Sequence, residues 1–196
     1  MNLPNRLSLL RIILVPVMAI LFLLKYNWSV ITAVCVFVIA CFTDFLDGHI
    51  ARKYNMVTDL GKLLDPIADK MLVCFGLFLV VEANCFNYGV IPQGVASFCA
   101  AIIICRELLI SVVRQIGASK GIIIHANVYG KIKTMVQYVA IPAMMLLVLN
   151  DAITSISGTL YAVLYWFAFG AFAVATILTV LSAIVYLVQN KSVFKS

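Results

Sequence analysis

Six long apolar runs with short polar connections constrain the fold of this 196-residue chain more than any other feature. A helix needs about 20 apolar residues to cross the hydrocarbon core of a bilayer. Hydrophobic residues make up 64% of the chain and charged residues 11%, whereas soluble domains average about 45–50% and about 25%. The sequence therefore predicts an all-α integral membrane protein, a single domain over 1–196 with six transmembrane helices. The predicted spans are 8–24, 29–50, 60–82, 92–114, 132–150 and 159–188.

The first residues and the basic side chains predict how these helices sit in a membrane. Residues 1–7 are polar enough to form a short N-terminal interfacial helix. Lys25 is alone on one side, because the connections at 83–91 and 151–158 contain no Lys or Arg. Most other basic residues flank the opposite ends of the spans, which the positive-inside rule assigns to the cytoplasm. We therefore expect both termini on the cytoplasmic side of the cell (inner) membrane. Because the basic residues fall between apolar spans, we do not read the net charge of +6 as a sign that the protein binds nucleic acid.

Four aspartates occur in a fixed pattern in the second and third apolar runs. Asp44 and Asp47 are three residues apart, and Asp65 and Asp69 are four residues apart. On helices, each pair lies on one face, and a polar turn at 54–58 makes the two helices antiparallel neighbours. We therefore expect the four carboxylates to meet below the cytoplasmic surface. A charge at the centre of a membrane helix costs about 2.5–3.5 kcal/mol on insertion scales, so four carboxylates together imply compensating cations, water or both. The cluster therefore predicts a binding site for something positively charged.

The chemistry of these ligands favours a hard divalent cation. The six cysteines show no paired CxxC spacing that would indicate zinc, and carboxylate oxygens suit Mg²⁺ or Mn²⁺. Two such ions would balance four formal charges, and two-metal sites suit displacement at phosphorus. Gly48 and Ala51 are small enough to let a polyphosphate approach the helix, and Arg52 would neutralise it.

The complete pattern resembles the signature of a known family. Asp44-x2-Asp47-Gly48-x2-Ala51-Arg52-x8-Gly61-x3-Asp65-x3-Asp69 is similar, at every specified position, to that of the CDP-alcohol phosphatidyltransferases. The resemblance extends to the family members that make phosphatidylglycerophosphate. It implies transfer of a phosphatidyl group from CDP-diacylglycerol to sn-glycerol 3-phosphate, with release of CMP and no covalent enzyme intermediate, in a homodimer embedded in membrane lipids. The stretches that carry this second resemblance are Asn2 to Asn5 with Ser8 and Arg11, Thr58 to Lys70, and Lys131 to Thr134.

The resemblance also implies roles for individual side chains. Asp44, Asp47 and Asp65 would be the main metal ligands. Asp69 would contribute to the metal site and act as the catalytic base on the glycerol hydroxyl. The residues implied in contacts with the CDP moiety are Asn5, Asp47, Gly48 and Arg52.

A second polar cluster lies outside this signature. Glu107 is too deep in the fourth span for casual solvation, so we expect a partner such as Arg106, Arg114 or Lys133. Basic side chains in the first, fourth and fifth spans predict a pocket for the acceptor phosphate, with Arg as a bidentate clamp and Lys as a point charge. Alternatively, the lysines anchor a helix end and Arg106 with Glu107 is a structural ion pair. The candidates for the pocket are Arg11, Arg106, Arg114, Lys131 and Lys133.

Two other functions are compatible with parts of this pattern. The same donor could serve another acceptor, namely phosphatidylglycerol, inositol phosphate or serine. A divalent-cation transporter could also place intramembrane carboxylates between helices. Transport explains neither Arg52 nor the nearby basic cluster, and the acids crowd one half of the membrane instead of lining a path across it.

Overall fold

The structure is a computed structural model that describes most of the chain. It describes the backbone of residues 3–53, 59–85, 93–119, 128–149, 153 and 157–189. Side chains are described over the same ranges, apart from 3–5, 45–53, 59–66, 69, 93, 116, 118–119 and 128–129.

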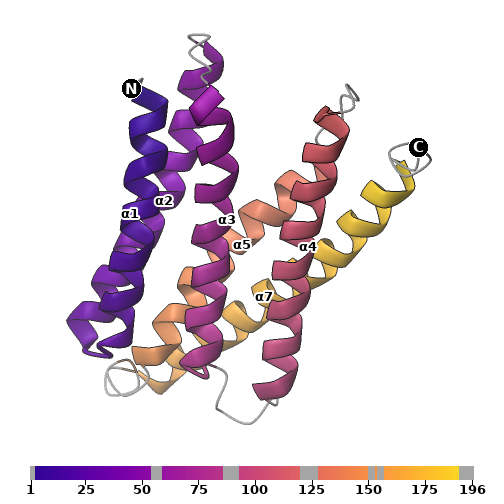
Figure 1. Cartoon of the computed structure of the whole chain (residues 1–196). Coiled ribbons are helices and arrows are strands. Elements are labelled where there is room, and N and C mark those ends of the chain that lie inside the picture. Colours follow the sequence, from indigo (N-terminus) through magenta and orange to yellow (C-terminus); the bar gives the residue numbers. More distant parts are fainter. Residues whose placement is uncertain are drawn as a thin grey trace.

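The described chain is helical, with six long helices and a short 3-10 helix. Figure 1 shows the long helices running in alternate directions, so that α1 begins and α7 ends at the same end of the bundle. We call this the motif end, because α2 ends and α3 begins there. The elements are α1 (Leu3–Leu23), α2 (Asn27–Lys53), α3 (Asp59–Glu82), α4 (Gln93–Ser119), α5 (Val128–Leu146), η1 (Leu147–Leu149) and α7 (Gly158–Gln189).

The predicted all-α membrane fold is confirmed. By length and composition, five helices of the described part could each cross a membrane: α1, α2, α4, α5 continued by η1, and α7. The sixth, α3, has 24 residues and a length of about 36 Å, but acidic and basic residues interrupt its first half. It stands beside α1 in Figure 1 and packs against α1, α4 and α5.

The first helix differs from the prediction at its N-terminus. Residues 3–7 form the first turns of α1, which continues without a break to Leu23. The described part of the predicted N-terminal helix, residues 3–7, is thus helical and continuous with the first span. Pro4 does not interrupt the helix, because proline is tolerated in a first turn, where the backbone N–H has no intrahelical partner.

Helix α3 ends in a compact turn over residues 83–85. Asn84 has a φ of 49°, the left-handed conformation that commonly closes a helix. Its N–H donates to the Val81 carbonyl at 3.1 Å, and the Cys85 N–H donates to the Val80 carbonyl at 3.4 Å. This pattern satisfies two carbonyls that the end of the helix would otherwise leave without donors.

A single main core cluster draws residues from all six long helices, including Val15, Phe37, Leu72, Ile103 and Phe172. Large apolar side chains also cover the outside of the bundle, as expected for helices that face lipid. The core lets two helices approach closely at Gly76 of α3. A Cβ there would lie 2.7 Å from Cγ2 of Ile141 on α5.

Candidate active site

Buried polar side chains gather in the half of the bundle nearest the motif end. They come from four helices that are far apart in the sequence, whereas the main core cluster is apolar. Burying so many polar groups is unfavourable unless they contact one another or a ligand. The buried polar residues in this half are Ser8 and Arg11 of α1, Glu107 of α4, Lys133 and Gln137 of α5, and Thr179 and Ser182 of α7.

Asp44 is the signature aspartate whose contacts are described, and two donors from different helices hold it. Nη1 of Arg11 donates to Oδ1 of Asp44 at 2.6 Å, and the Tyr138 hydroxyl donates to Oδ2 at 3.0 Å. The Arg11 side chain is fully buried, while that of Asp44 is 28% exposed. Because α1, α2 and α5 each supply one of these groups, helix packing fixes the position of this carboxylate.

Glu107 forms the centre of a second cluster. Nζ of Lys70 on α3 donates to Oε2 of Glu107 at 2.9 Å, and Nζ of Lys133 on α5 contacts Oε1. Nη1 of Arg106 lies 3.7 Å from Oε1. Three cationic side chains thus surround one buried carboxylate, and the four groups together carry a net positive charge. The expectation that Glu107 has a partner such as Arg106, Arg114 or Lys133 is confirmed, and the partners found among these three are Arg106 and Lys133.

Arg106 also ties this cluster to the last helix. Its Nη2 donates to Oγ of Ser182 at 2.9 Å, and Ser182 in turn donates to the Thr179 carbonyl at 3.0 Å. The same Nη2 lies 4.0 Å from where a Cβ of Gly130 would be. The guanidinium therefore lies close to α5 as well as contacting α7, although its Nε has no hydrogen-bond partner within the described part.

Helix α5 connects the two clusters. Lys133 and Tyr138 are five residues apart, which corresponds to about 7.5 Å along the axis and about 140° around it. One side chain therefore reaches α4 and the other reaches α2. Between them, Gln137 is buried, and its Nε2 finds no hydrogen-bond partner among the described residues.

The remaining predicted residues of the signature are placed by their backbones. Asp47, Gly48 and Arg52 lie on α2, and Asp65 and Asp69 lie on α3. Both stretches are helical, as the prediction that each pair shares one face requires. The side chains of these residues, and that of Asn5, fall outside the described residues, so the predicted meeting of four carboxylates stays a prediction.

Two predicted members of the basic pocket are exposed, unlike the buried cluster around Glu107. Arg114 and Lys131 are exposed, in the last turns of α4 and the first turns of α5. Arg114 shares a helical face with Glu107, but it lies two turns nearer the end of α4. The structure therefore brings Arg106 and Lys133 together around Glu107 and leaves Arg114 and Lys131 at the rim, while Arg11 contacts Asp44.

Lys70, Tyr138 and Ser182 are the site residues that sequence reasoning missed. A signal existed for Lys70, since it directly follows Asp69 and lies opposite a predicted buried glutamate. Tyr138 directly follows the polar residues of the fifth span, but a tyrosine in an apolar run is equally typical of the lipid interface. Nothing in the local sequence distinguishes Ser182 from other small packing residues.

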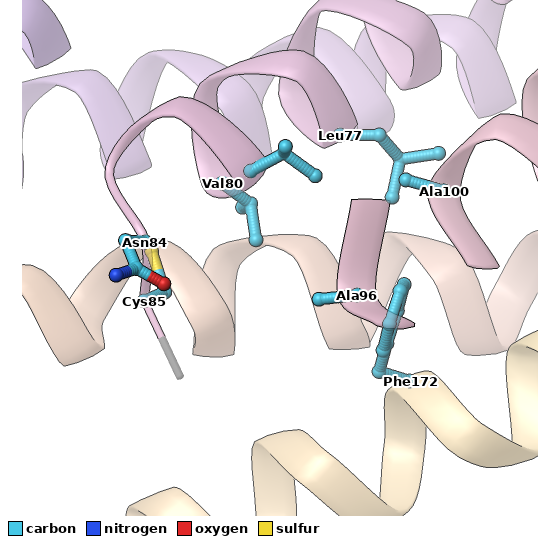
Figure 2. A pocket seen from close by; sticks show the side chains of 8 residues that line it. Leu77, Val80, Asn84, Cys85, Ala96, Ala100 and Phe172 are labelled. Carbon is cyan, nitrogen blue, oxygen red and sulfur yellow. The ribbon is translucent and has the colours of Figure 1, made fainter. Parts of the chain in front are cut away.

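A pocket at the opposite end of the bundle is distinct from this site. Figure 2 shows it between α3 with the turn that ends it, α4 and α7, with Leu77, Val80, Ala96, Ala100 and Phe172 around it. Its cavity volume is ≈ 10 Å³, close to what one water molecule needs. It is therefore too small for a nucleotide or a lipid headgroup.

The contacts of Asp44 fit a role as a metal ligand. Each oxygen of an ionised carboxylate can accept more than one contact, so the donors from Arg11 and Tyr138 do not by themselves prevent the carboxylate from coordinating a cation. The Asp44 side chain is also partly exposed, so it is not sealed inside the bundle. Within the described residues, no group of three or more His, Cys, Asp or Glu side chains comes together, because the side chains of the other signature aspartates are not among them.

Comparisons with known proteins agree with the resemblance. A family model described as CDP-alcohol phosphatidyltransferase matches residues 1–171. The chain is 36% identical over 157 residues to the CDP-diacylglycerol–glycerol-3-phosphate 3-phosphatidyltransferase of Bacillus subtilis (strain 168), covering 74% of this chain and 77% of the relative. Proteins of the same name from Pseudomonas fluorescens and Escherichia coli (strain K12) are 40% identical over 121 residues and 37% identical over 142 residues. These alignments cover 62% and 71% of this chain, and 58% and 74% of the respective relatives.

Proposed function

The chain belongs to the CDP-alcohol phosphatidyltransferase family, and on that basis we propose that it transfers a phosphatidyl group from CDP-diacylglycerol to sn-glycerol 3-phosphate. The products are phosphatidylglycerophosphate and CMP. The observation that carries this proposal is the match of the family model over residues 1–171, which includes the whole aspartate signature. The names of the relatives support glycerol 3-phosphate as the acceptor.

The donor side of the site would be formed by α2 and α3. Asp44, Asp47, Asp65 and Asp69 would hold Mg²⁺ or Mn²⁺, as two ions. When bound, these ions would stabilise the negative charge that builds on the β-phosphate during displacement. Asp69 would accept the proton of the glycerol hydroxyl while the hydroxyl oxygen attacks phosphorus and CMP leaves.

The nucleotide would contact a second set of groups near the same helix ends. Arg52 can pair with pyrophosphate oxygens, and Gly48 leaves space for their approach to α2. Asn5 and Asp47 would complete the CDP contacts. The acyl chains of the donor would stay in lipid, where the outer faces of the helices are apolar.

The acceptor side would be formed by the basic cluster around Glu107. Its net positive charge and the burial of Lys133 favour binding of a phosphate dianion at this position. The contacts favour Arg106 and Lys133 as the principal anchors, joined by Lys70. Arg11, Arg114 and Lys131 would act around them, Arg11 beside Asp44 and the other two at the rim. Anchoring the acceptor phosphate orients the hydroxyl and disfavours attack by water.

In the cell, we propose that residues 1–196 form one domain in the inner membrane with the motif end facing the cytoplasm, and that the protein is a homodimer. The concentration of Lys and Arg near the motif end supports this orientation. The dimer rests on the family resemblance, and cross-linking of the protein in native membranes would test it.

The test of the function is an acceptor panel. Purified protein in lipid nanodiscs is given CDP-diacylglycerol and Mg²⁺ with glycerol 3-phosphate, phosphatidylglycerol, inositol phosphate or serine, while CMP release and lipid products are measured. We expect phosphatidylglycerophosphate from glycerol 3-phosphate. Turnover with another alcohol instead would change the acceptor. Metal flux into proteoliposomes without lipid turnover would favour transport over transfer.

A further inference from the structure

Two side chains from other helices hold the carboxylate of Asp44 in one orientation. Its two carboxylate oxygens accept from different donors, Nη1 of Arg11 at 2.6 Å and the hydroxyl of Tyr138 at 3.0 Å. A carboxylate on a helix can rotate about its side-chain bonds. Two donors on opposite oxygens, supplied by two other helices, restrict that rotation.

The donors themselves are held firmly. Arg11 is fully buried on α1. Tyr138 follows the buried Lys133 and Gln137 on α5, and Lys133 is fixed by its contact with Glu107. The helix then contains Pro142, which cannot donate the usual backbone hydrogen bond to the carbonyl four residues earlier, that of Tyr138. The tyrosine thus sits at a defined break in the hydrogen-bond ladder of α5.

We propose that Tyr138 and Arg11 are positioning residues that orient Asp44 for a divalent cation. The inference rests on the proposed role of Asp44 as a metal ligand. Partners that hydrogen-bond a ligating group fix its orientation, and their loss typically weakens metal affinity or activity about 10–100-fold. The two residues have different effects on charge. Tyr138 donates a hydrogen bond without adding charge, whereas Arg11 also offsets the charge of the carboxylate.

Tyr138→Phe isolates the orienting hydrogen bond, since it removes one hydroxyl and leaves the ring. Tyr161→Phe is the control, because it removes the same hydroxyl from a tyrosine in the first turn of α7, a helix that begins at the opposite end of the bundle (Figure 1). Mn²⁺ binding to each purified protein is measured by electron paramagnetic resonance, without substrate, and Asp44→Asn serves as the reference for loss of the ligand. The Mg²⁺ dependence of CMP release is measured separately.

We expect Tyr138→Phe to weaken Mn²⁺ binding about 10–100-fold and Tyr161→Phe to leave it unchanged. High Mg²⁺ should restore turnover of Tyr138→Phe towards the wild-type kcat, which it would not do if the substitution only damaged the fold. Arg11→Lys is a second variant that keeps the charge but changes the geometry of the donor, and we expect weaker Mn²⁺ binding there too.

The outcomes separate this inference from the proposed function. If Asp44→Asn weakens Mn²⁺ binding while Tyr138→Phe and Arg11→Lys do not, the positioning role is wrong and the metal site stands. If Asp44→Asn itself leaves Mn²⁺ binding unchanged, Asp44 is not a ligand, and both the metal assignment and the positioning role fail. Turnover of Tyr138→Phe that stays low at saturating Mg²⁺ also overturns the positioning role.

Discussion

Glu107 shows how much depends on one residue in this bundle. Three cationic side chains from α3, α4 and α5 surround its carboxylate, which is almost fully buried. Removing one partner of a buried ion pair is typically destabilising by about 3–5 kcal/mol, because the other charge stays buried. We expect a smaller loss of stability when the Glu107 carboxylate is removed, because Lys70 is partly exposed and water can hydrate its ammonium group.

Glu107→Gln is therefore expected to lower the free energy of unfolding by at least about 2 kcal/mol. Thermal unfolding in detergent would measure the change, and Glu82→Gln is the control because Glu82 is exposed at the other end of α3. Equal melting temperatures for the two variants would show that the Glu107 carboxylate does not stabilise the fold.

Asp69 is expected to determine chemistry more than stability. If it is the base on the acceptor hydroxyl, Asp69→Asn removes proton acceptance and should lower kcat at least about 10²-fold. CMP release at saturating substrates and Mg²⁺ would measure this. The variant should still insert and melt like the wild type, and retention of wild-type kcat would remove Asp69 from the base role.

Cys85 gives a prediction about pH. It lies in the turn after α3, and burial raises the pKa of its thiol to about 12. A thiol is ordinarily half ionised near pH 9, so between pH 9 and 12 the unfolded chain loses this proton while the folded protein keeps it. The contribution of Cys85 to stability is therefore complete below pH 9 and is lost as the pH rises towards 12.

A variant that retains Cys85 as its one cysteine should thus resist maleimide at pH 7 to 9 while folded and react after unfolding in SDS, since the thiolate is the reactive form. Mass spectrometry of the labelled protein would follow the reaction. Rapid labelling of the folded variant would show that the turn is open to solvent.

At the scale of the elements, α3 depends on a glycine for its close approach to α5 and α2. A Cβ at Gly76 would lie 2.7 Å from Cγ2 of Ile141 and 3.1 Å from Cε2 of Phe37. Cγ2 of Ile141 belongs to a branched side chain and Cε2 of Phe37 to a ring, so neither atom is the end of a flexible side chain that could move aside. Overpacking of a core typically costs about 1–3 kcal/mol.

Gly76→Ala should therefore destabilise the protein by about 1–3 kcal/mol, measured by thermal unfolding in detergent. Gly170→Ala is the matched control, because nothing lies within 4 Å of its Cβ position. In a helix interior that control should gain up to about 1 kcal/mol from helix propensity. A similar stability of the two variants would contradict the close approach.

The elements also mark what sequence patterns can and cannot predict. All six helices were expected from apolar runs, but the runs end where polarity begins, whereas α2 continues as helix to Lys53 and α1 starts at Leu3. The spacing of Asp44 and Asp47 placed them on one helical face from local periodicity alone. The pairing of Arg11 with Asp44 depends on how α1 packs against α2, which no local pattern contains. For the same reason, Lys70 and Tyr138 emerge as site residues only in the folded chain.

At the scale of the whole molecule, the bundle predicts a topology that labelling can test. Asn27 begins α2 at the end opposite the motif end, and Gln189 ends α7 at the motif end. Single cysteines introduced at these positions in an otherwise cysteine-free chain should react with a membrane-impermeant maleimide from opposite sides. Gln189→Cys should label in inside-out vesicles and Asn27→Cys in intact spheroplasts. Labelling of both from one side would contradict the even number of crossings.

The path of α5 between the two polar clusters has a consequence for how such a chain can change. Lys133 and Tyr138 lie on the same helix and contact Glu107 on α4 and Asp44 on α2. Both contacts therefore depend on the number of residues between Lys133 and Tyr138. One inserted residue would rotate Tyr138 by about 100° relative to Lys133, and no single sliding movement could restore both contacts. A point substitution can therefore change one cluster without the other. An insertion or deletion between Lys133 and Tyr138 would instead prevent the two contacts from forming at the same time.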